Sequence, residues 1–458
     1  MRKLIAILST IIAFAWVGFT ANAAEVSQES QTCIMCHSTQ NGAVVKQWES
    51  SKHAENSVGC YECHKAEKGE KDAMEHYGNF TISAIVSPKD CGSCHEGESA
   101  SMQNSHHATA NKFTGSLDNV VGRLVTGEAN FHLGCEQCHG SNIEVDEKGH
   151  PVAPTWPNNG IGRVNPDGTA GSCTGCHNRH SFDIAQARIP ETCGKCHQGP
   201  DHPQYEIYTL SKHGIQFKAM EDEIDLKGDF VLGKDYYQAP NCVTCHMGAT
   251  ANGLESTHNV GARIKWTLRP PISKVLEAEY GLPDGEGRRE EMKKVCVNCH
   301  QAPFYEQFFE MFDDYVDLYN EKFAVPATDM MKKLQEIGAV DPSPFTEQVE
   351  WDYWHLWHHE GRRGRHGAAM QAPDWSHWHG MYEVAYNFYF HMIPHANKEV
   401  EDELKAGNIT QAQADEWAVF RDEILDRREH KWIRGLSKEE RENIASFYQK
   451  RYGEEGGQ

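Results

Sequence analysis

Basic residues are scarce in this chain. Its 458 residues include 44 Lys and Arg against 66 Asp and Glu, which gives a formal net charge of −22 at pH 7. A surface of this sign repels a phosphate backbone, so the composition argues against a nucleic-acid-binding protein. It suits a protein that docks onto a basic partner, although the same charge also serves ordinary solubility.

Long apolar runs are missing after the N-terminus. Residues 4–19 form an apolar stretch that follows Arg2 and Lys3 and precedes the small residues Ala21-Asn22-Ala23. This pattern is typical of a signal peptide that is removed on export, and a retained membrane anchor is the alternative. We expect residues 1–24 to be a signal peptide and the mature chain to be a soluble periplasmic protein.

Cysteine is absent outside one repeated motif, Cys-x-x-Cys-His. The eight copies use all 16 cysteines: Cys33, Cys36, Cys60, Cys63, Cys91, Cys94, Cys135, Cys138, Cys173, Cys176, Cys193, Cys196, Cys242, Cys245, Cys296 and Cys299. The histidines that close them are His37, His64, His95, His139, His177, His197, His246 and His300. A zinc site or a disulfide framework would not place a histidine after every pair. The motif attaches c-type haem through two thioethers and supplies an iron ligand, so we predict eight covalently bound haem c groups.

Neither a β-strand pattern nor a fixed repeat length is present. Residues 25–305 carry all the motifs, at irregular spacing and with many Gly, Pro, Asn and Ser residues between them. This pattern predicts a haem domain of short helices and loops that is ordered by its cofactors. Residues 306–458 instead have helical periodicity and form a predicted C-terminal helical domain. The predicted fold class is therefore mainly α, with a multihaem cytochrome c domain of little regular structure followed by long helices.

The predicted C-terminal helices cover residues 306–338, 345–361, 374–396, 410–432 and 437–452. Thr410 with Gln413, and Ser437 with Glu440, have the spacing of capping boxes. Proline residues and Gly407 are expected to separate the helices. The dense aromatic residues of this region, such as Trp375 and Trp378, are expected to pack in a core or between subunits rather than to bind a cofactor.

The histidine count bears on which haems could do chemistry. Two histidine ligands close an iron and make it an electron relay, whereas an open position can bind a substrate. Of the 27 histidines, ten lie between the first and the last motif without belonging to one. They are His53, His76, His106, His107, His132, His150, His180, His202, His213 and His258.

Several segments resemble the octahaem hydroxylamine oxidoreductase family. They are residues 160–168 before the fifth motif, 199–205 after the sixth, 233–236 before the seventh, and 378–383 in the helical region. The resemblance covers nearly the whole mature chain. No motif ends in Lys, which argues against the related octahaem nitrite and tetrathionate reductases.

The resemblance implies seven haems with two histidine ligands and one open catalytic haem on the fourth motif. The distal ligands that it implies are His53, His76, His106 or His107, His132, His202, His213 and His258, with His150 left as a loop residue. It also implies a catalytic pocket that contains His180, Asp167 and Tyr236. Side chains of these types could supply protons to a nitrogen compound bound to iron.

One departure from the family bears on the direction of the reaction. The oxidising members carry a tyrosine that cross-links to the catalytic haem, and Trp375 stands at the matching position. An indole has no phenol oxygen, so no cross-link is expected. We therefore expect reduction of nitrite or hydroxylamine toward ammonium. Oxidation of hydroxylamine or hydrazine and pure electron transfer are the alternatives.

The resemblance also implies partners. They are a membrane quinol-oxidising cytochrome c or a small soluble cytochrome as electron donor, and two further copies of the chain in a homotrimer.

Overall fold

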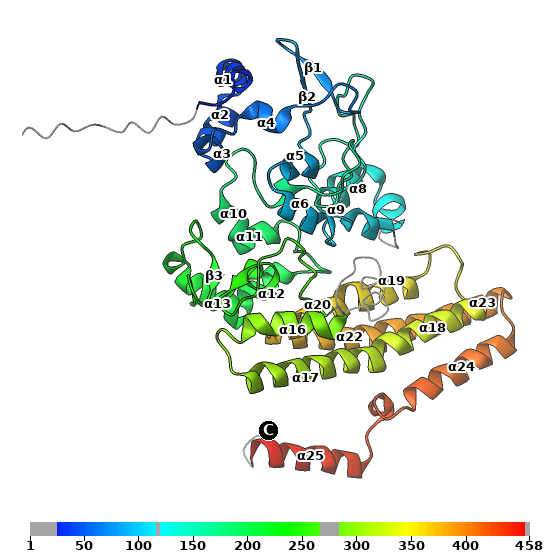
Figure 1. Cartoon of the computed structure of the whole chain (residues 1–458). Coiled ribbons are helices and arrows are strands. Elements are labelled where there is room, and N and C mark those ends of the chain that lie inside the picture. The colour runs from blue at the N-terminus through cyan, green and yellow to red at the C-terminus, as the bar shows by residue number, and fades with distance from the viewer. Residues whose placement is uncertain (1–24, 116–119, 266–283, 454–458) are drawn as a thin grey trace, which may run out of the picture. The chain divides into compact units, whose positions relative to one another are not determined.

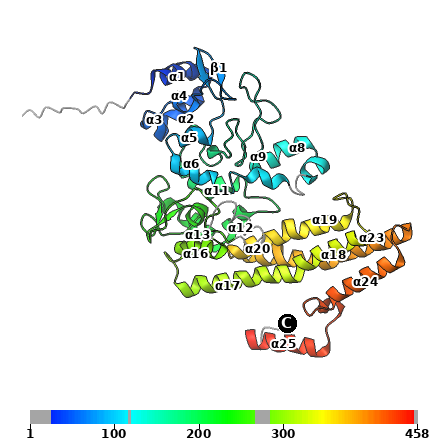
Figure 2. The same ribbon diagram turned by 45° about the vertical axis from the view of Figure 1, so that its right-hand side comes forward.

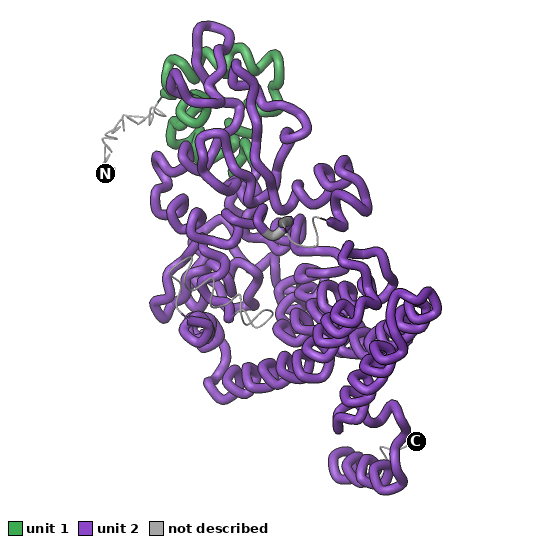
Figure 3. Tube along the Cα trace, turned by 90° about the vertical axis from the view of Figure 1, so that its right-hand side faces the viewer, with its two compact units in different colours: residues 1–65, 179–182 green, residues 66–178, 183–458 purple. Residues whose placement is uncertain are grey.

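The computed structural model describes residues 25–115, 120–265 and 284–453, which fold mainly as helices (Figure 1). The predicted signal peptide, residues 1–24, lies outside the described residues. Within these ranges, no helix combines the length and the apolar character needed to cross a bilayer. The chain divides into two compact units, coloured separately in Figure 3. The smaller contains residues up to 65 together with 179–182, and the larger contains residues 66–178 and 183–458.

The smaller unit is built from four helices: α1 Gln28–Gln40, α2 Gly42–Glu49, α3 Lys52–Glu55 and α4 Cys60–His64. The buried Ser30 ties α1 to α4. Its hydroxyl donates to the Glu62 carboxylate at 2.8 Å and accepts from the Tyr61 backbone N–H at 2.9 Å. These bonds fix the helix that carries the second Cys-x-x-Cys-His motif.

Residues 66–300 of the larger unit form short elements joined by loops. The helices are α5 Pro88–Gly92, α6 Glu96–Gln103, η1 Ala110–Gly115, η2 Val120–Val125, α8 Glu128–Leu133, α9 Cys135–His139, η3 Cys173–Gly175, α10 Ile184–Arg188, α11 Pro190–Gly194, α12 Gln204–Leu210, α13 Lys212–Met220, η4 Glu221–Glu223, α14 Cys242–His246 and α16 Gly285–Cys296. Strands β1 Met74–His76 and β2 Phe80–Ile82 pair antiparallel, and β3 Val231–Leu232 and β4 Ala249–Thr250 pair parallel. The predicted scarcity of regular structure is confirmed, and these two small strand pairs were not predicted.

Long helices dominate from residue 302 onward, as predicted. The first runs through α17 Ala302–Tyr319, η5 Asn320–Ala324 and α18 Val325–Glu336; the second through α19 Gln348–Trp354, η6 His355–Glu360 and α20 Gly361–Ala369. The third runs through α21 Pro373–Ser376, η7 His377–Tyr382, α22 Glu383–Asn387, η8 Phe388–Met392 and α23 Ile393–Ala406. Then follow α24 Gln411–Leu425, η9 Lys431–Arg434 and α25 Lys438–Tyr452.

Two prolines lie inside these helices, where the sequence had suggested breaks. Pro326 and Pro394 each follow a wide π turn, η5 or η8. Proline lacks the backbone N–H that an α-helix needs, and a wider turn changes the pairing at that position. The capping boxes at Thr410 and Ser437 are confirmed, and α23 ends at Gly407 in the left-handed region.

The main hydrophobic core belongs to the helical region, where α17, α18, α22 and α23 run alongside one another (Figures 1 and 2). It contains Phe323, Met330, Leu334, Phe388 and Trp417, all nearly inaccessible to solvent. Glycines allow the closest approaches: a Cβ on Gly380 would lie 2.5 Å from the Cα of Gly364. The change from short elements to long helices near residue 306 lies inside the larger unit. A domain boundary at that position stays a prediction.

Candidate haem ligands and a buried Asp–His cluster

Three Cys-x-x-Cys-His motifs fold as separate short helices. α4, α9 and α14 each begin at the first cysteine and end at the histidine. Residues i, i+3 and i+4 share one face of a helix, so both thiols and the imidazole project from the same side. One porphyrin held by two thioethers and an iron–nitrogen bond needs that arrangement. All sixteen thiols are free of disulfides and fit this use.

Four motif histidines face a histidine from another part of the chain. The pairs are His64 with His180, His177 with His258, His197 with His107, and His300 with His213. Their ring centroids lie 6.1–6.5 Å apart with interplanar angles of 30–45°. Two imidazoles on opposite sides of one metal, each with a bond of roughly 2 Å, have centroids about this far apart. Each pair therefore has the spacing of two axial ligands of one iron.

These pairs separate the predicted distal ligands that face a motif histidine from those that do not. His213, His258 and one of the alternatives, His107, face a motif histidine. His53 instead lies edge-on to Phe182 at 4.8 Å. His132 hydrogen-bonds the Glu136 carboxylate through Nδ1 at 2.7 Å, and His76 is exposed on β1. His106 is buried beside Gly261. For these four residues a ligand role stays a prediction.

Hydrogen bonds orient several motif histidines. His139 Nδ1 donates to the Ala110 carbonyl at 3.1 Å, and His37 Nδ1 lies 2.6 Å from the Asn41 side-chain oxygen. When Nδ1 carries the proton, Nε2 keeps the lone pair that binds a metal. The local structure thus prepares these imidazoles for iron.

A His107→Ala variant should open the haem of the sixth motif. Since His107 is the residue facing His197, its loss should convert one low-spin haem to high spin, visible as a new high-spin signal in electron paramagnetic resonance. His150→Ala is the control, because His150 is an exposed loop histidine paired with Asp146. An unchanged spectrum for the His107 variant, or the same new signal in both, would exclude this assignment.

Asp167 and Tyr236, two of the predicted pocket residues, are held by separate local partners. Asp167 accepts from Ser87 Oγ at 2.5 Å and from the Thr169 N–H at 2.8 Å. Burial alone would raise its pKa, but these hydrogen bonds hold it below its ordinary value. Tyr236 shares a 2.7 Å hydrogen bond with Thr244, and burial raises its pKa.

His180, the third predicted pocket residue, lies in the smaller unit opposite His64, 6.4 Å between centroids. Burial and then the neighbouring His64 lower the pKa of His180. The imidazole is thereby kept neutral, the form that binds a metal. The pocket role of His180 stays a prediction, and its position opposite His64 also suits an axial ligand.

A buried charged cluster surrounds Asp201 and His202. Asp201 Oδ1 lies 2.5 Å from His202 Nδ1, and Arg362 Nη1 donates to Asp201 Oδ2 at 3.1 Å. The Nε2 of His358 is 4.0 Å from the same oxygen. Although desolvation works against both charges, the ion pair raises the pKa of His202 and lowers that of Asp201. The ion pair therefore favours a protonated His202 beside an ionised Asp201.

The cluster contacts the sixth motif, where the His202 and His197 ring centroids lie 6.2 Å apart, and it acts electrostatically on Cys138 of the fourth motif. The hydrogen bond with the Cys196 thiol, and next to it the charge of His202, lower the pKa of the Cys138 thiol to about 6. His202 Nε2 also donates to the Cys196 carbonyl at 2.9 Å. The contacts of His202 with Asp201 and Cys196 suit an acid–base role. Its ligand role stays a prediction.

Sequence reasoning missed Asp201, Arg362 and His358. The adjacent Asp-His pair in residues 199–205 was the available signal for Asp201. Arg362 and His358 come from the helix that runs from α19 to α20, where Trp354 stacks on His358 at 4.3 Å. Nothing in the local pattern connects that helix with the motif cysteines.

Trp375 is partly buried in α21. Its ring centroid lies 5.0 Å from that of His379, and its backbone packs against Gly367, where a Cβ would come within 2.6 Å. Tyr382 and Tyr386, further along the same helix, are about half exposed. The position that matches the family's cross-linking tyrosine therefore carries an indole packed within its own chain.

Comparison with known proteins finds matches to multihaem cytochromes over parts of the chain. The family described as "Seven times multi-haem cytochrome CxxCH" matches residues 165–341, and "Cytochrome c554 and c-prime" matches residues 18–65. A probable nitrite reductase–hydroxylamine oxidoreductase fusion protein of Kuenenia stuttgartiensis is 24% identical over 370 residues. That match covers 70% of this chain and 39% of the relative, so the chain spans about two fifths of the relative's length.

Two solved structures share the fold. A hypothetical multiheme protein is 26% identical with a TM-score of 0.69, over 85% of this chain and 98% of that one. The Kuenenia stuttgartiensis reducing HAO-like protein complex is 18% identical with a TM-score of 0.60, over 83% of this chain and 87% of that one. The second comparison shows a similarity of fold alone.

Proposed function

We propose that the chain, which matches multihaem cytochrome families over residues 18–65 and 165–341, is a periplasmic octahaem enzyme that reduces nitrite, hydroxylamine or both toward ammonium. The observation that carries this proposal is the Asp201–His202 cluster, which contacts Cys196 of the sixth motif and acts electrostatically on Cys138 of the fourth. Reduction of these compounds consumes protons together with electrons, and a protonated histidine held by a carboxylate is suited to deliver them.

We use the facing histidines to assign which haems transfer electrons and which haem binds the substrate. An iron with two histidine ligands passes electrons, and an iron with one open position also binds the nitrogen compound. We assign the four facing pairs to relay haems, with His180 as the distal ligand of the second motif. The open haem belongs to the fourth motif, whose His139 is oriented by the Ala110 carbonyl. Three further relays complete the set of seven that we propose.

The residues of the Asp201–His202 cluster have distinct proposed roles. His202 gives a proton to the bound substrate, and the Asp201 carboxylate raises the pKa of that imidazole. The Arg362 guanidinium fixes Asp201 and adds positive charge that attracts an anion such as nitrite. Asp167 and Tyr236 are hydrogen-bonded to Ser87 and Thr244. Their proposed role in the pocket requires that haem binding breaks these hydrogen bonds.

The direction of the reaction rests on Trp375. The indole is unable to form the phenol-oxygen link of the oxidising members, so the catalytic haem stays an ordinary haem c that delivers electrons. A membrane quinol-oxidising cytochrome c or a small soluble cytochrome is the proposed donor. A homotrimer is the proposed assembly, for which the exposed aromatic row of Trp378, Tyr382, Tyr386 and Phe390 offers a surface.

Two assays on the purified holoprotein test the proposal. With a low-potential electron donor, nitrite and hydroxylamine should yield ammonium, whereas hydroxylamine should reduce the oxidised haems slowly or not at all. Mass spectrometry should find every tyrosine free of haem.

Two outcomes would overturn the proposal. Fast haem reduction by hydroxylamine with no ammonium formed would reverse the direction. An electron paramagnetic resonance spectrum with only low-spin haem would indicate a protein that transfers electrons without catalysing the reaction.

A further inference from the structure

One face of α17 and the start of α18 exposes a regular apolar row. Phe304, Met311, Leu318 and Val325 are 47–64% exposed and lie seven residues apart. Side chains at heptad spacing form one stripe along a helix, and such a stripe is a helix–helix seam. The chain nevertheless leaves this stripe open to solvent over about six turns of helix.

An acidic row runs beside the apolar one. Glu310, Asp314, Asp317 and Glu321 are all exposed. The α17 sequence contains five carboxylates and no basic residue. The seam therefore selects for a partner that carries positive charge beside its own apolar stripe.

The stripe also forms one wall of an open groove of about 400 Å³. Phe304, Phe308, Met311 and Phe312 line it from α17, and Ala368 and Gln371 form part of the facing wall. A concave apolar surface of this kind accepts large side chains from a partner helix.

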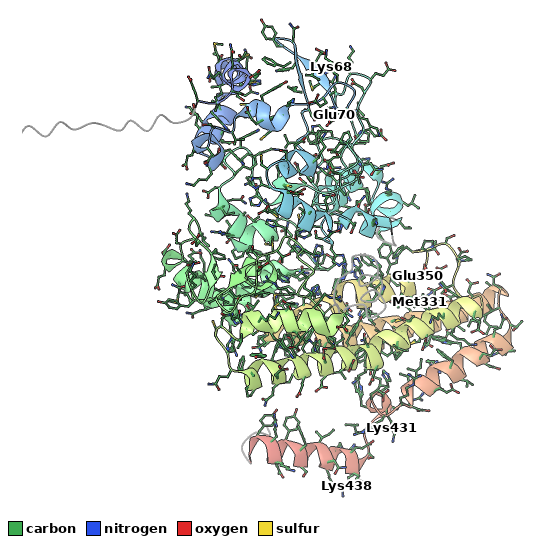
Figure 4. All side chains as sticks on the ribbon, in the orientation of Figure 1. Lys68, Glu70, Met331, Glu350, Lys431 and Lys438 are labelled. Atoms are coloured by element: carbon green, nitrogen blue, oxygen red, sulfur yellow. The ribbon has the colours of Figure 1, made fainter. Side chains whose placement is uncertain are left out.

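The last helix, α25, has the complementary features. All its residues are exposed or nearly so, and none is buried. Ile444, Phe447, Tyr448 and Tyr452 are 46–63% exposed and cluster on one face. Its second half, from Asn443 on, carries only basic charges, those of Lys450 and Arg451. Figure 4 labels Lys438, which opens the helix, and Lys431 in the preceding η9.

We propose that α25 of one copy packs along the apolar row of α17 in a second copy. The helix has 15 residues and a length of about 22 Å, so it fits within the row from Phe304 to Val325. Ile444, Tyr448 and Tyr452 face Met311 and Leu318, and Arg451 lies beside the acidic row. This seam is distinct from the aromatic row proposed for the trimer, and it does not depend on the reaction.

A second copy is the occupant because one copy leaves both faces uncovered. The α25 stripe and the α17 stripe are exposed within the same chain, although they match in length, apolar character and charge. Association of identical chains brings each α25 to an α17 and buries both. Exposed apolar faces of this size are typical of interaction surfaces.

Site-specific cross-linking of the holoprotein tests the seam. A photoreactive benzoyl-phenylalanine in place of Phe447 should cross-link to the α17 peptides. The product should have twice the chain mass on a denaturing gel. The matched control places the same group at Ser446, on the opposite face of α25, and should give no such product. Arg451→Glu should lose most of the cross-link, and adding Glu310→Lys should restore it.

Other results would overturn the inference. A cross-link to α17 at the mass of a single chain would mean that α25 folds back onto its own copy. Cross-links to other segments, or equal yields from positions 446 and 447, would exclude the seam. Haem absorbance checks that each variant is folded. Ammonium formation, measured on the same samples, tests the proposed reaction independently.

Discussion

Replacing His202 with alanine is expected to lower the rate of ammonium formation from nitrite by roughly 10²–10⁴-fold, the usual contribution of a general acid. The haem content and the proportion of low-spin haem should not change, because His202 has both ring nitrogens engaged with Asp201 and Cys196 rather than with iron. Steady-state kinetics with a low-potential donor and electron paramagnetic resonance measure the two quantities. Loss of a low-spin signal in this variant would support the ligand role instead.

Asp146 and His150 provide the matched control for this experiment. They form an exposed pair, with His150 Nδ1 3.2 Å from Asp146 Oδ2, in a loop of the same unit. His150→Ala should leave the rate unchanged. A comparable fall in both variants would show a general loss of folding rather than of proton delivery.

Asp201→Asn adds a pH signature to the same test. In the wild type, the ion pair raises the pKa of His202, so protonated His202 persists above the ordinary value of about 6.5 and is lost as the pH rises through the raised pKa. Without Asp201, desolvation remains and lowers that pKa. The alkaline fall in rate should therefore move to lower pH in the variant. A pH–rate profile that does not move would exclude His202 as the titrating acid.

The haem-free chain is expected to lose its structure in residues 66–300 and to keep it in residues 302–425. The main core, from Tyr319 to Ile424, is made only of side chains from the helical region. Residues 66–300 contribute a second buried cluster of eight residues, from Tyr208 to Val295. An apolar core of that size does not offset the conformational entropy of so long a segment. Haem attachment must supply the remainder.

Limited proteolysis of chain produced without haem attachment measures this difference. The helical fragment should survive while the preceding segment is digested, and the holoprotein should resist in both regions. Equal resistance of the two regions to proteolysis in the haem-free chain would mean that residues 66–300 are stable without haem. Equal digestion would mean that the helices also depend on haem.

Much of the helical region could be predicted because its signals are local. The capping box at Thr410 and the periodicity of residues 306–338 act within a few turns, and both are found in the structure. The helix predicted over residues 374–396 extends to Ala406, and that extension beyond Pro394 was missed. A proline next to a π turn is tolerated for reasons of backbone geometry that residue identity alone does not reveal.

The candidate site was predicted less completely because its residues meet through the fold. The motif cysteines and histidines are evident in the sequence, since each attachment site is contiguous. The facing histidines are not, because His107 and His213 precede their partners whereas His180 and His258 follow theirs. Arg362 reaches Asp201 from a distant helix, and only packing brings these two side chains together.

The order of the facing histidines along the chain has a consequence for biogenesis. A chain that leaves the ribosome and crosses a membrane N-terminus first delivers His107 before His197 and His213 before His300. Under the proposed export and ligand assignments, the sixth and eighth motifs would have both histidines available as soon as haem is attached. His64 would wait for His180, and His177 for His258. The proposal thus implies a staggered maturation in which the second and fifth motifs would acquire their second histidine last.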